Sequence, residues 1–401
     1  MTSWRLRTIQ DICTVFDGPH ATPVKTETGP WFLSISSLVN GRLTLAESAH
    51  VSDADFAKWT RRVTPQAGDL LFSYETRLGD AALMPPGLKA CLGRRMGLLR
   101  PKLDQVDPRF LLYSYLGPEF QHEIATRAIH GATVDRIPLA ELPKWRMRLP
   151  ALPEQQAIAE VLGALDDKIA VNERIAETAA QLADALYIRE SSSAQGWVGV
   201  TLSETARWFS GGTPKTSEPN YWGGGIPWIS AASLKSPWID DSDRKVTPEG
   251  AANGTRLVPE GSIIFVVRGM SLTSEFRVGL TQRKVAFGQD CKALIPRAGI
   301  NPATLFLAIK SMTPEILGYV DLAGHGTGRL ATDRIANLSV KLPTDSAAAD
   351  FAQSVVPLIE RASATKRENR TLAALRDTLL PQLVTGKLRI KDAERAVEDA
   401  V

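Results

Sequence analysis

The sequence contains little cysteine and no long hydrophobic run. Its three cysteines, Cys13, Cys91 and Cys291, are far apart and form no Cys-x-x-Cys pair. This argues against a disulfide framework or a thiolate zinc site and favours a reducing compartment, so we expect a cytoplasmic protein. No apolar run approaches the roughly 18 residues of a membrane-spanning helix. The opening residues, "MTSWRLRTIQDICTVF", lack an uninterrupted apolar core, so neither a membrane association nor a signal peptide is expected.

Motifs of common catalytic and metal sites are also missing. The sequence has no Gly-x-x-x-x-Gly-Lys-Ser/Thr phosphate loop and no Asp/Asn-Pro-Pro-Tyr/Phe segment. The five histidines show no metal-ligand spacing. The adjacent acids Asp166–Asp167 and Asp240–Asp241 are more typical of solvated surface than of a catalytic pair. We therefore expect a non-catalytic protein with no metal site and no cofactor.

The charge of the chain is nearly balanced. Its 47 basic and 44 acidic residues give a net charge of +3. This is only a weak indication of a polyanionic partner, because a local basic stripe can be offset by acidic surface elsewhere. A length of 401 residues predicts two or three domains.

An internal repeat organises the chain. Six segments recur in the same order at an offset of about 193 to 196 residues, and such an ordered series indicates a duplication. The matched segments are Trp31–Leu38 with Pro227–Leu234, Thr64–Phe72 with Val258–Phe265, Ala90–Lys102 with Val285–Arg297, the segments that begin at Asp107 and Asn301, the "HGAT" and "HGTG" loops at His130 and His325, and "RLP" at 148–150 with "KLP" at 341–343.

Each copy contains short strands and helices. The apolar runs at 69–74 and 262–267 are rich in β-branched or aromatic residues and predict buried strands. The segments 108–116 and 302–310 follow Asp or Asn and begin with Pro, which predicts helices. Each copy is therefore expected to be a mixed α/β domain of about 150 residues, large enough for its own core.

Each copy ends in a long helix with an apolar stripe. The first stripe comprises Ile158, Val161, Leu165, Ile175, Leu182 and Leu186, and the second comprises Val355, Leu358, Ala362, Leu372, Leu379 and Leu383. Both carry Asn at a matching heptad position, Asn172 and Asn369. Either stripe could pack on its own domain, but the match favours packing of the helices on each other. Pro357 is expected to kink the second helix or to mark its start.

The expected fold is of the α/β class, with two tandem mixed α/β domains separated by two long helices. Each copy enters its helix from the same side, so the helices should form an antiparallel coiled coil about a pseudo-two-fold axis. The predicted segments are a first domain at 1–150, a helix at 151–190, a second domain at 191–343, a helix at 344–388 and a flexible tail at 389–401. The segment "ESSSAQG" at 190–196 is expected to be a flexible bridge.

The two helical segments resemble a known family. "LPALPEQQAIAEVLGALDDKI" at 149–169 resembles the central conserved segment of the specificity subunits of Type I restriction-modification enzymes. "LRDTLLPQLVTGKLRI" at 375–390 resembles their C-terminal conserved segment. The resemblance covers nearly the whole chain. One departure is that the second copy lacks the "PEQ" sequence and has "LPTDSAAAD" instead.

The resemblance implies a non-catalytic subunit in which each domain is a target-recognition domain for one half of a split double-stranded DNA sequence. It implies that the helices set the gap and dock two methyltransferase (modification) subunits, and that a restriction subunit joins the assembled complex. The alternative is a non-catalytic protein-binding scaffold with duplicated domains. From Ile158 to Leu186 the first stripe spans 29 positions, about 43 Å at 1.5 Å per residue. That length suits half-sites about 34–36 Å apart.

Polar and basic residues at equivalent places are the candidates for DNA contact, because base edges and phosphates are read by such side chains. For each, a structural role is the alternative: a salt bridge, plain surface charge, or a capping or buried histidine. In "PNYWGGGIPWI", Trp222 and Trp228 could stack on bases, but a local core is favoured. The DNA-contact candidates are Arg77, Lys89, Arg94, Arg95, His130 and Thr133 in the first copy, and Arg268, Arg283, Lys284, Gln289, His325, Thr327 and Arg329 in the second.

Overall fold

The computed structural model describes residues 4–131, 134–193, 195–323 and 327–399. The chain divides into two compact units, each of which is described by itself. Unit 1 comprises Met1–Ala170 and Asn369–Val401, and unit 2 comprises Val171–Glu368. Each unit therefore contains one of the two α/β domains together with part of both long helices.

Unit 1 is built on two small sheets. An antiparallel sheet has the strand order β2-β10-β7-β8, and a second sheet has the order β6-β3-β9 with β3 and β9 parallel. The strands are β1 (Arg5–Thr8), which pairs with β11 (Arg146–Leu149), β2 (Cys13–Asp17), β3 (Thr26–Leu33), β4 (Leu38–Val39), β5 (Arg42–Leu43), β6 (Ala49–His50), β7 (Leu70–Ser73), β8 (Ala81–Leu83), β9 (Ala90–Leu92) and β10 (Met96–Pro101). The helices are α1 (Ile9–Ile12), α2 (Asp53–Trp59), α3 (Pro108–Leu116) and α4 (Pro118–Arg127).

Unit 2 repeats this arrangement with additional strands. Its larger sheet has the order β13-β22-β18-β20-β15, and the second sheet has the order β16-β14-β21-β17. The strands are β12 (Trp197–Thr201), which pairs with β25 (Ser339–Pro343), β13 (Ala206–Ser210), β14 (Trp222–Ile229), β15 (Trp238–Ile239), β16 (Lys245–Val246), β17 (Arg256–Val258), β18 (Ile263–Val266), β19 (Arg268–Gly269), β20 (Val278–Thr281), β21 (Val285–Phe287), β22 (Cys291–Pro296), β23 (Val320–Ala323) and β24 (Thr327–Leu330). The helices are α6 (Leu202–Thr205), α7 (Pro248–Ala252), α8 (Pro302–Ser311), α9 (Thr313–Gly318) and α10 (Thr332–Ala336).

Strand register confirms the internal repeat. In unit 1, β3 and β9 pair in parallel with Phe32 opposite Cys91, and in unit 2 β14 and β21 do the same with Trp228 opposite Ala286. Both β3 and β14 also pair with a short antiparallel strand through an irregular register. The predicted buried strands at 69–74 and 262–267 are β7 and β18, whose residues are all buried.

The predicted helices at 108–116 and 302–310 are α3 and α8. The Asp107 side chain accepts a hydrogen bond from the Phe110 N–H at 3.0 Å. The Asn301 side chain accepts from the N–H groups of Ala303 and Thr304 at 2.9 and 3.2 Å. These caps satisfy N–H groups that have no partner inside the helix, which is why Asp or Asn before Pro was a reliable start signal.

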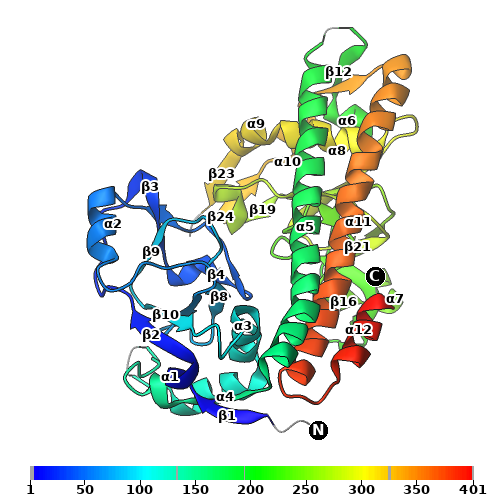
Figure 1. Ribbon diagram of the computed structural model, residues 1–401. Helices are drawn as coiled ribbons and strands as arrows, with labels where there is room; N and C mark the ends of the chain where they lie inside the picture. The colour runs from blue at the N-terminus through cyan, green and yellow to red at the C-terminus, as the bar shows by residue number, and fades with distance from the viewer. Residues whose placement is uncertain (1–3, 132–133, 194, 324–326, 400–401) are drawn as a thin grey trace. The chain divides into compact units, whose positions relative to one another are not determined.

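The two long helices are α5 (Leu152–Ser191) and α11 (Asp345–Leu383), which lie side by side (Figure 1). In unit 1, Asp166 of α5 pairs with Arg376, and three residues further along α5 the Ile169 carbonyl accepts from Asn369. The position on α11 falls as the position on α5 rises, so the helices are antiparallel, as predicted. In unit 2 the second part of α5 packs with the first part of α11, where the Tyr187 and Phe351 rings are 6.1 Å apart.

The predicted stripe on α5 is correct at its start and wrong at Leu182. Ile158, Val161, Leu165 and Asn172 are buried and Ile175 is partly buried, but Leu182 is 47% exposed. The buried positions in this part of the helix are Ala179, Ala183 and Tyr187. A strict seven-residue repeat drifts by about 20° per heptad on a straight helix, so the buried face moves to the next residue. On α11, Leu372 and Leu379 are buried, and Leu358 and Asn369 are partly buried.

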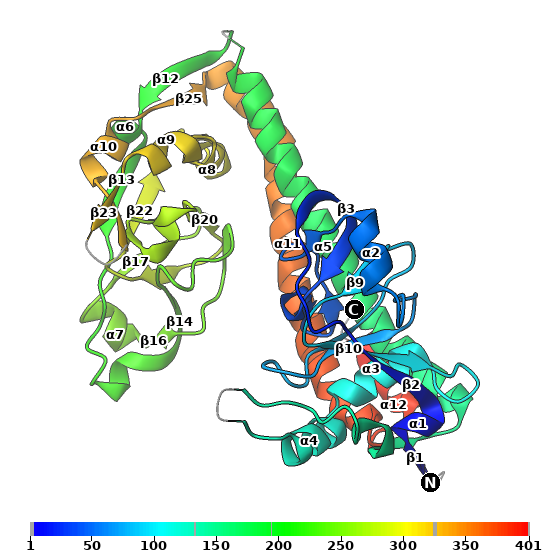
Figure 2. The ribbon, with the colours of Figure 1, turned by 90° about the vertical axis from the view of Figure 1, so that its left-hand side faces the viewer.

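Two expectations for the C-terminal part of the chain are also corrected. Pro357 does not mark the start of its helix, because α11 begins at Asp345 and continues past it. Pro357 lies on an exposed face, where the loss of one N–H donor is tolerated. The tail expected to be flexible contains α12 (Ile390–Glu398; Figure 2). Ala393 of this helix is buried in the core of unit 1. Its apolar residues at helical spacing explain the order.

The "PEQ" sequence fixes the start of α5 through Gln155. This side chain is 1% exposed. Its amide N–H groups donate to the carbonyls of Pro150 and Gln105 at 3.0 and 3.2 Å, and its oxygen accepts from the Asp107 N–H at 3.0 Å. In unit 2 the start of α11 is held by aromatic contacts instead. Phe351 packs edge to face on Trp197, with ring centroids 5.0 Å apart.

Candidate nucleic-acid interface

The candidate interface lies at the same place in both units. It is formed where the buried strand ends (β7 in unit 1 and β18 in unit 2), beside the turn that precedes its antiparallel partner (β10 in unit 1 and β22 in unit 2). In unit 1 the Tyr74 N–H donates to the Arg95 carbonyl at 3.1 Å, and in unit 2 the Val267 N–H donates to the Asp290 carbonyl at 2.9 Å. A third segment completes each site: Arg136 pairs across from Glu75 in unit 1, and β24 pairs with β19 in unit 2.

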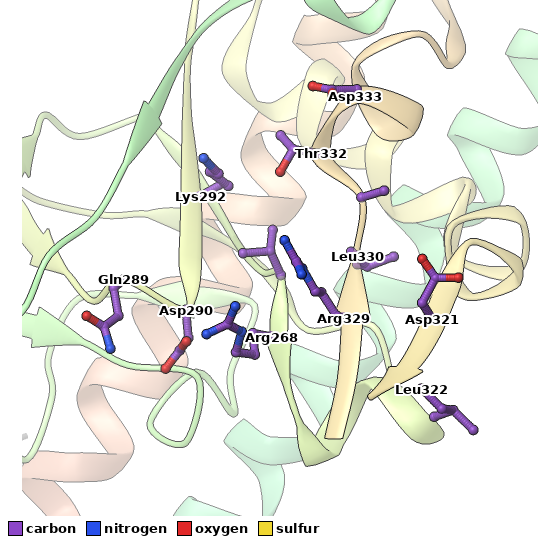
Figure 3. A pocket seen from close by; sticks show the side chains of 12 residues that line it. Arg268, Gln289, Asp290, Lys292, Asp321, Leu322, Arg329, Leu330, Thr332 and Asp333 are labelled. Atoms are coloured by element: carbon purple, nitrogen blue, oxygen red, sulfur yellow. The ribbon is translucent and has the colours of Figure 1, made fainter. Parts of the chain in front are cut away.

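In unit 2 these segments enclose a hollow of about 980 Å³, which we call the unit 2 hollow (Figure 3). It brings together three of the predicted residues, Arg268, Gln289 and Arg329. Arg268 and Arg329 are directly opposite each other on β19 and β24, and both are exposed. Lys292, which sequence reasoning missed, also lines the hollow, and its ammonium group donates to the Ser210 hydroxyl at 2.6 Å. The lining also includes three acids, Asp290, Asp321 and Asp333.

In unit 1 the corresponding turn carries Arg94 and Arg95. Arg94 is exposed. Arg95 has a left-handed backbone with φ of 72°, and its guanidinium pairs with Glu75 at 2.6 Å and donates to the Thr76 hydroxyl at 3.2 Å. Arg95 therefore has a structural partner, whereas Arg94 is presented to solvent.

A basic cluster beside this turn was missed in the sequence. A hollow of about 260 Å³ is bordered by Leu92, which precedes the turn, and by four basic residues: His20, Lys58, Arg61 and Arg62. The Arg62 guanidinium pairs with Asp17 at 2.6 Å. The "KWTRR" run at 58–62 was visible as local positive charge, but its proximity to the turn depends on how α2 packs.

Other predicted residues lie away from these two hollows. Arg77 pairs with Asp80 and donates to the carbonyls of Ile35 and Leu38, so it braces a loop. Lys89 pairs with Asp53 at 2.7 Å and lies over the Phe56 ring.

Arg283 and Lys284 are exposed in the turn between β20 and β21. This turn follows Thr281, whose N–H donates to the Ser262 carbonyl at the start of β18, whereas the unit 2 hollow lies at the end of β18. The Nδ1 atom of the exposed His130 lies 3.0 Å from the Oδ1 atom of Asp135. Thr327 is the first residue of β24. Thr133 and His325 lie outside the described residues.

The aromatic loop of unit 2 forms a local core, as favoured from the sequence. Trp228 is 5% exposed and packs edge to face on Trp222, with ring centroids 5.4 Å apart. The Arg244 guanidinium lies 3.9 Å from the Trp222 centroid and 4.7 Å from the Trp228 centroid. Arg244 thus lies against both rings, which favours the local core over a platform on which a base could stack.

The adjacent acids on α5 have structural roles. Asp166 accepts from the Tyr113 hydroxyl at 2.7 Å and from the Arg376 guanidinium at 2.7 Å, so it connects α3, α5 and α11 within unit 1. Burial raises the pKa of Tyr113, and the Asp166 carboxylate raises it further, so the phenol remains protonated and donates. Asp167 is exposed and pairs with Arg109 at 2.9 Å.

Residues 1–181 and 194–367 match the family model of the Type I restriction modification DNA specificity domain. The chain belongs to this family. It is a Type I restriction-modification specificity subunit with two recognition domains, a DNA-recognition component rather than a catalytic one. The duplicated domains and the antiparallel helices agree with the expectation drawn from the sequence.

Relatives of the chain are also named as specificity subunits of Type I restriction enzymes. The chain is 24% identical to the Type I restriction enzyme MjaIX specificity subunit of Methanocaldococcus jannaschii, over 97% of this chain and 94% of the relative. It is 29% identical to the EcoR124I/EcoR124II specificity subunit of Escherichia coli over 36% of each chain. Its fold is similar to that of the S subunit from M. genitalium, with a TM-score of 0.65, 18% identity and coverage of 95% and 96%. Among the described residues, none of the helices combines the length and the apolar character that a membrane span requires.

Proposed function

We propose that each unit reads one half of a bipartite duplex DNA target. The observation that carries this proposal is the recurrence of one site with different side chains. The turn residue beside the buried strand is Arg95 in unit 1 and Asp290 in unit 2, while the backbone hydrogen bond at that position is the same. A shared scaffold with different reading groups is what two different half-sites require, because sequence is read by side chains at base edges.

The long helices determine the spacing of the two half-sites and dock two methyltransferase subunits in this proposal. Both helices pass from one unit into the other, so each connects the two recognition domains through continuous helix. A restriction subunit joins through the assembled complex. Asn172 is buried on α5, and the Asn369 side chain donates to the Ile169 carbonyl. We propose that these polar residues at matching heptad positions help to set the register of the helices.

The salt dependence of duplex binding tests the proposal against a protein-binding scaffold. We expect the logarithm of the binding constant to fall linearly with the logarithm of salt concentration, because phosphate contacts release counterions. A reader with six to ten phosphate contacts loses about 10³- to 10⁵-fold in affinity between about 50 and 200 mM salt. The full chain is titrated with duplexes that contain and lack the methylated motif. A flat response without preference for any duplex would support the scaffold.

Replacing Arg94 by Ala should weaken recognition through the first half-site alone. Arg94 is exposed at the unit 1 turn, so its loss removes a donor without opening the core. We expect a loss of about 1–3 kcal/mol if Arg94 contacts a base and less if it contacts a phosphate. Binding to duplexes mutated in one half-site at a time measures the effect. Lys144→Ala, which removes an exposed lysine paired with Glu141, is the matched control and should leave both half-sites unchanged. Equal binding by Arg94→Ala and the parent would remove Arg94 from the interface.

A further inference from the structure

The two units carry opposite charges at equivalent positions of their candidate sites. In unit 1 the residue that follows the buried strand is Glu75, and its carboxylate pairs with Arg95 of the turn at 2.6 Å. In unit 2 the equivalent residues are Arg268 and Asp290, so the cation stands on the strand and the acid on the turn. The third segment carries an arginine in both units, but Arg136 is opposite Glu75 in unit 1, whereas Arg329 is opposite Arg268 in unit 2.

Two arginines directly opposite on neighbouring strands are unfavourable by themselves. Like charges at such positions destabilise a sheet pair. Lys292 adds a third cation to the same hollow. Asp321, which is directly opposite Arg329 on β23, offsets part of this repulsion. A ligand that presents hydrogen-bond acceptors would offset the rest, and unit 1 has no such pair at the equivalent position, where Glu75 faces Arg136.

The acids in the hollow distinguish a base edge from a phosphate. Asp290 lies beside Arg268, Asp321 is directly opposite Arg329 on β23, and Asp333 lies toward another part of the rim (Figure 3). A phosphate next to Arg268 would meet the Asp290 carboxylate and be repelled. A guanine–cytosine pair instead offers acceptors at guanine O6 and N7 and an amino donor at cytosine N4, side by side in the major groove.

We infer that the unit 2 hollow reads one guanine–cytosine pair of the second half-site. Arg268 and Arg329 donate to guanine O6 and N7, and the Asp290 carboxylate accepts from the cytosine amino group. This inference rests on the proposed function, since it names the chemistry that one recognition domain selects. Arg268, Arg329 and Asp290 are then specificity-determining residues for the second half-site.

The test compares methylated motifs in a host that expresses the full chain with its methyltransferase partner. For Arg268→Ala and Arg329→Ala we expect one guanine–cytosine position of one half-site to become degenerate, with a loss of preference of about 5- to 150-fold. The other half-site and the gap should not change. Arg297→Ala is the matched control, because Arg297 is exposed just beyond the opposite end of β22 and should leave the motif intact.

Lysine variants separate base reading from phosphate attraction. Arg268→Lys and Arg329→Lys keep the positive charge but lose the planar fork that donates to two acceptors. We expect them to relax the same position while affinity for a duplex that lacks the motif, measured across salt, stays within about two-fold of the parent.

Three results would overturn the inference. One is an unchanged motif with uniformly weaker binding in the alanine variants, which identifies a phosphate contact. Another is a variant motif that differs from the parent motif at no guanine–cytosine position. The last is a parent chain that yields no split motif at all, and only that result also overturns the proposed function.

Discussion

Inserting one helical turn into both long helices should lengthen the unread gap of the DNA motif by one or two base pairs. Four helix-forming residues are inserted after Ala170 and four after Glu368, where each helix passes from one unit into the other. Four residues add about 6 Å at 1.5 Å per residue. DNA advances about 3.4 Å per base pair. The bases of both half-sites should stay the same, because no residue of either hollow changes.

The matched control for this insertion adds the same four residues after Ser193. This segment follows the end of α5 at Ser191, so it lengthens the connection without lengthening a helix. The control should leave the gap unchanged. Methylome sequencing of both variants measures the gap directly. An unchanged gap in the helix variant, or altered bases within a half-site, would mean that the helices do not set the spacing.

Asp166→Ala should destabilise unit 1 by about 2–4 kcal/mol, because it leaves the Tyr113 hydroxyl and the Arg376 guanidinium without their shared acceptor. The Arg376 side chain is 18% exposed, so water replaces the lost partner only in part. Asp166→Asn should have a smaller effect, since the amide oxygen can still accept from Tyr113 but cannot neutralise Arg376.

Asp167→Ala is the neighbouring control for this prediction. Asp167 is exposed and its side chain pairs with the exposed Arg109, so we expect a loss of less than about 1 kcal/mol. Hydrogen exchange under native conditions measures the stability of each unit separately. Amides of β7 and β10 in unit 1 should exchange faster in Asp166→Ala, whereas those of β18 and β22 in unit 2 should not. Equal protection in both aspartate variants would contradict the role given to Asp166.

Periodicity and capping residues predicted most of the fold. The strand at 69–74 and the helix at 108–116 carry local signals, an apolar run and an Asp-Pro start, and both occur in the structure. The repeat then transferred each prediction to the second copy. Leu182 was misplaced because residue size outweighed position: the alanines at 179 and 183 make a less obvious stripe than the leucines, yet they are the buried residues.

The candidate site was harder to predict because it depends on contacts between distant segments. Arg268 and Arg329 were both candidates, but nothing local in the sequence places them opposite each other on β19 and β24. Lys292 was missed because it occupies a strand, where alternation predicts only that its side chain faces away from the core. The ion pairs of Arg77 and Lys89 could not be predicted, because their acidic partners, Asp80 and Asp53, cannot be assigned from spacing alone.

Methylome sequencing of a host that expresses this chain with its methyltransferase partner tests the central claim most directly. Two recognition domains joined by continuous helices predict a single bipartite motif, in which two specified half-sites flank a gap of fixed length. An Arg268→Lys chain sequenced in parallel should alter one half-site only. A continuous motif, a gap of variable length or the absence of any motif would contradict the account.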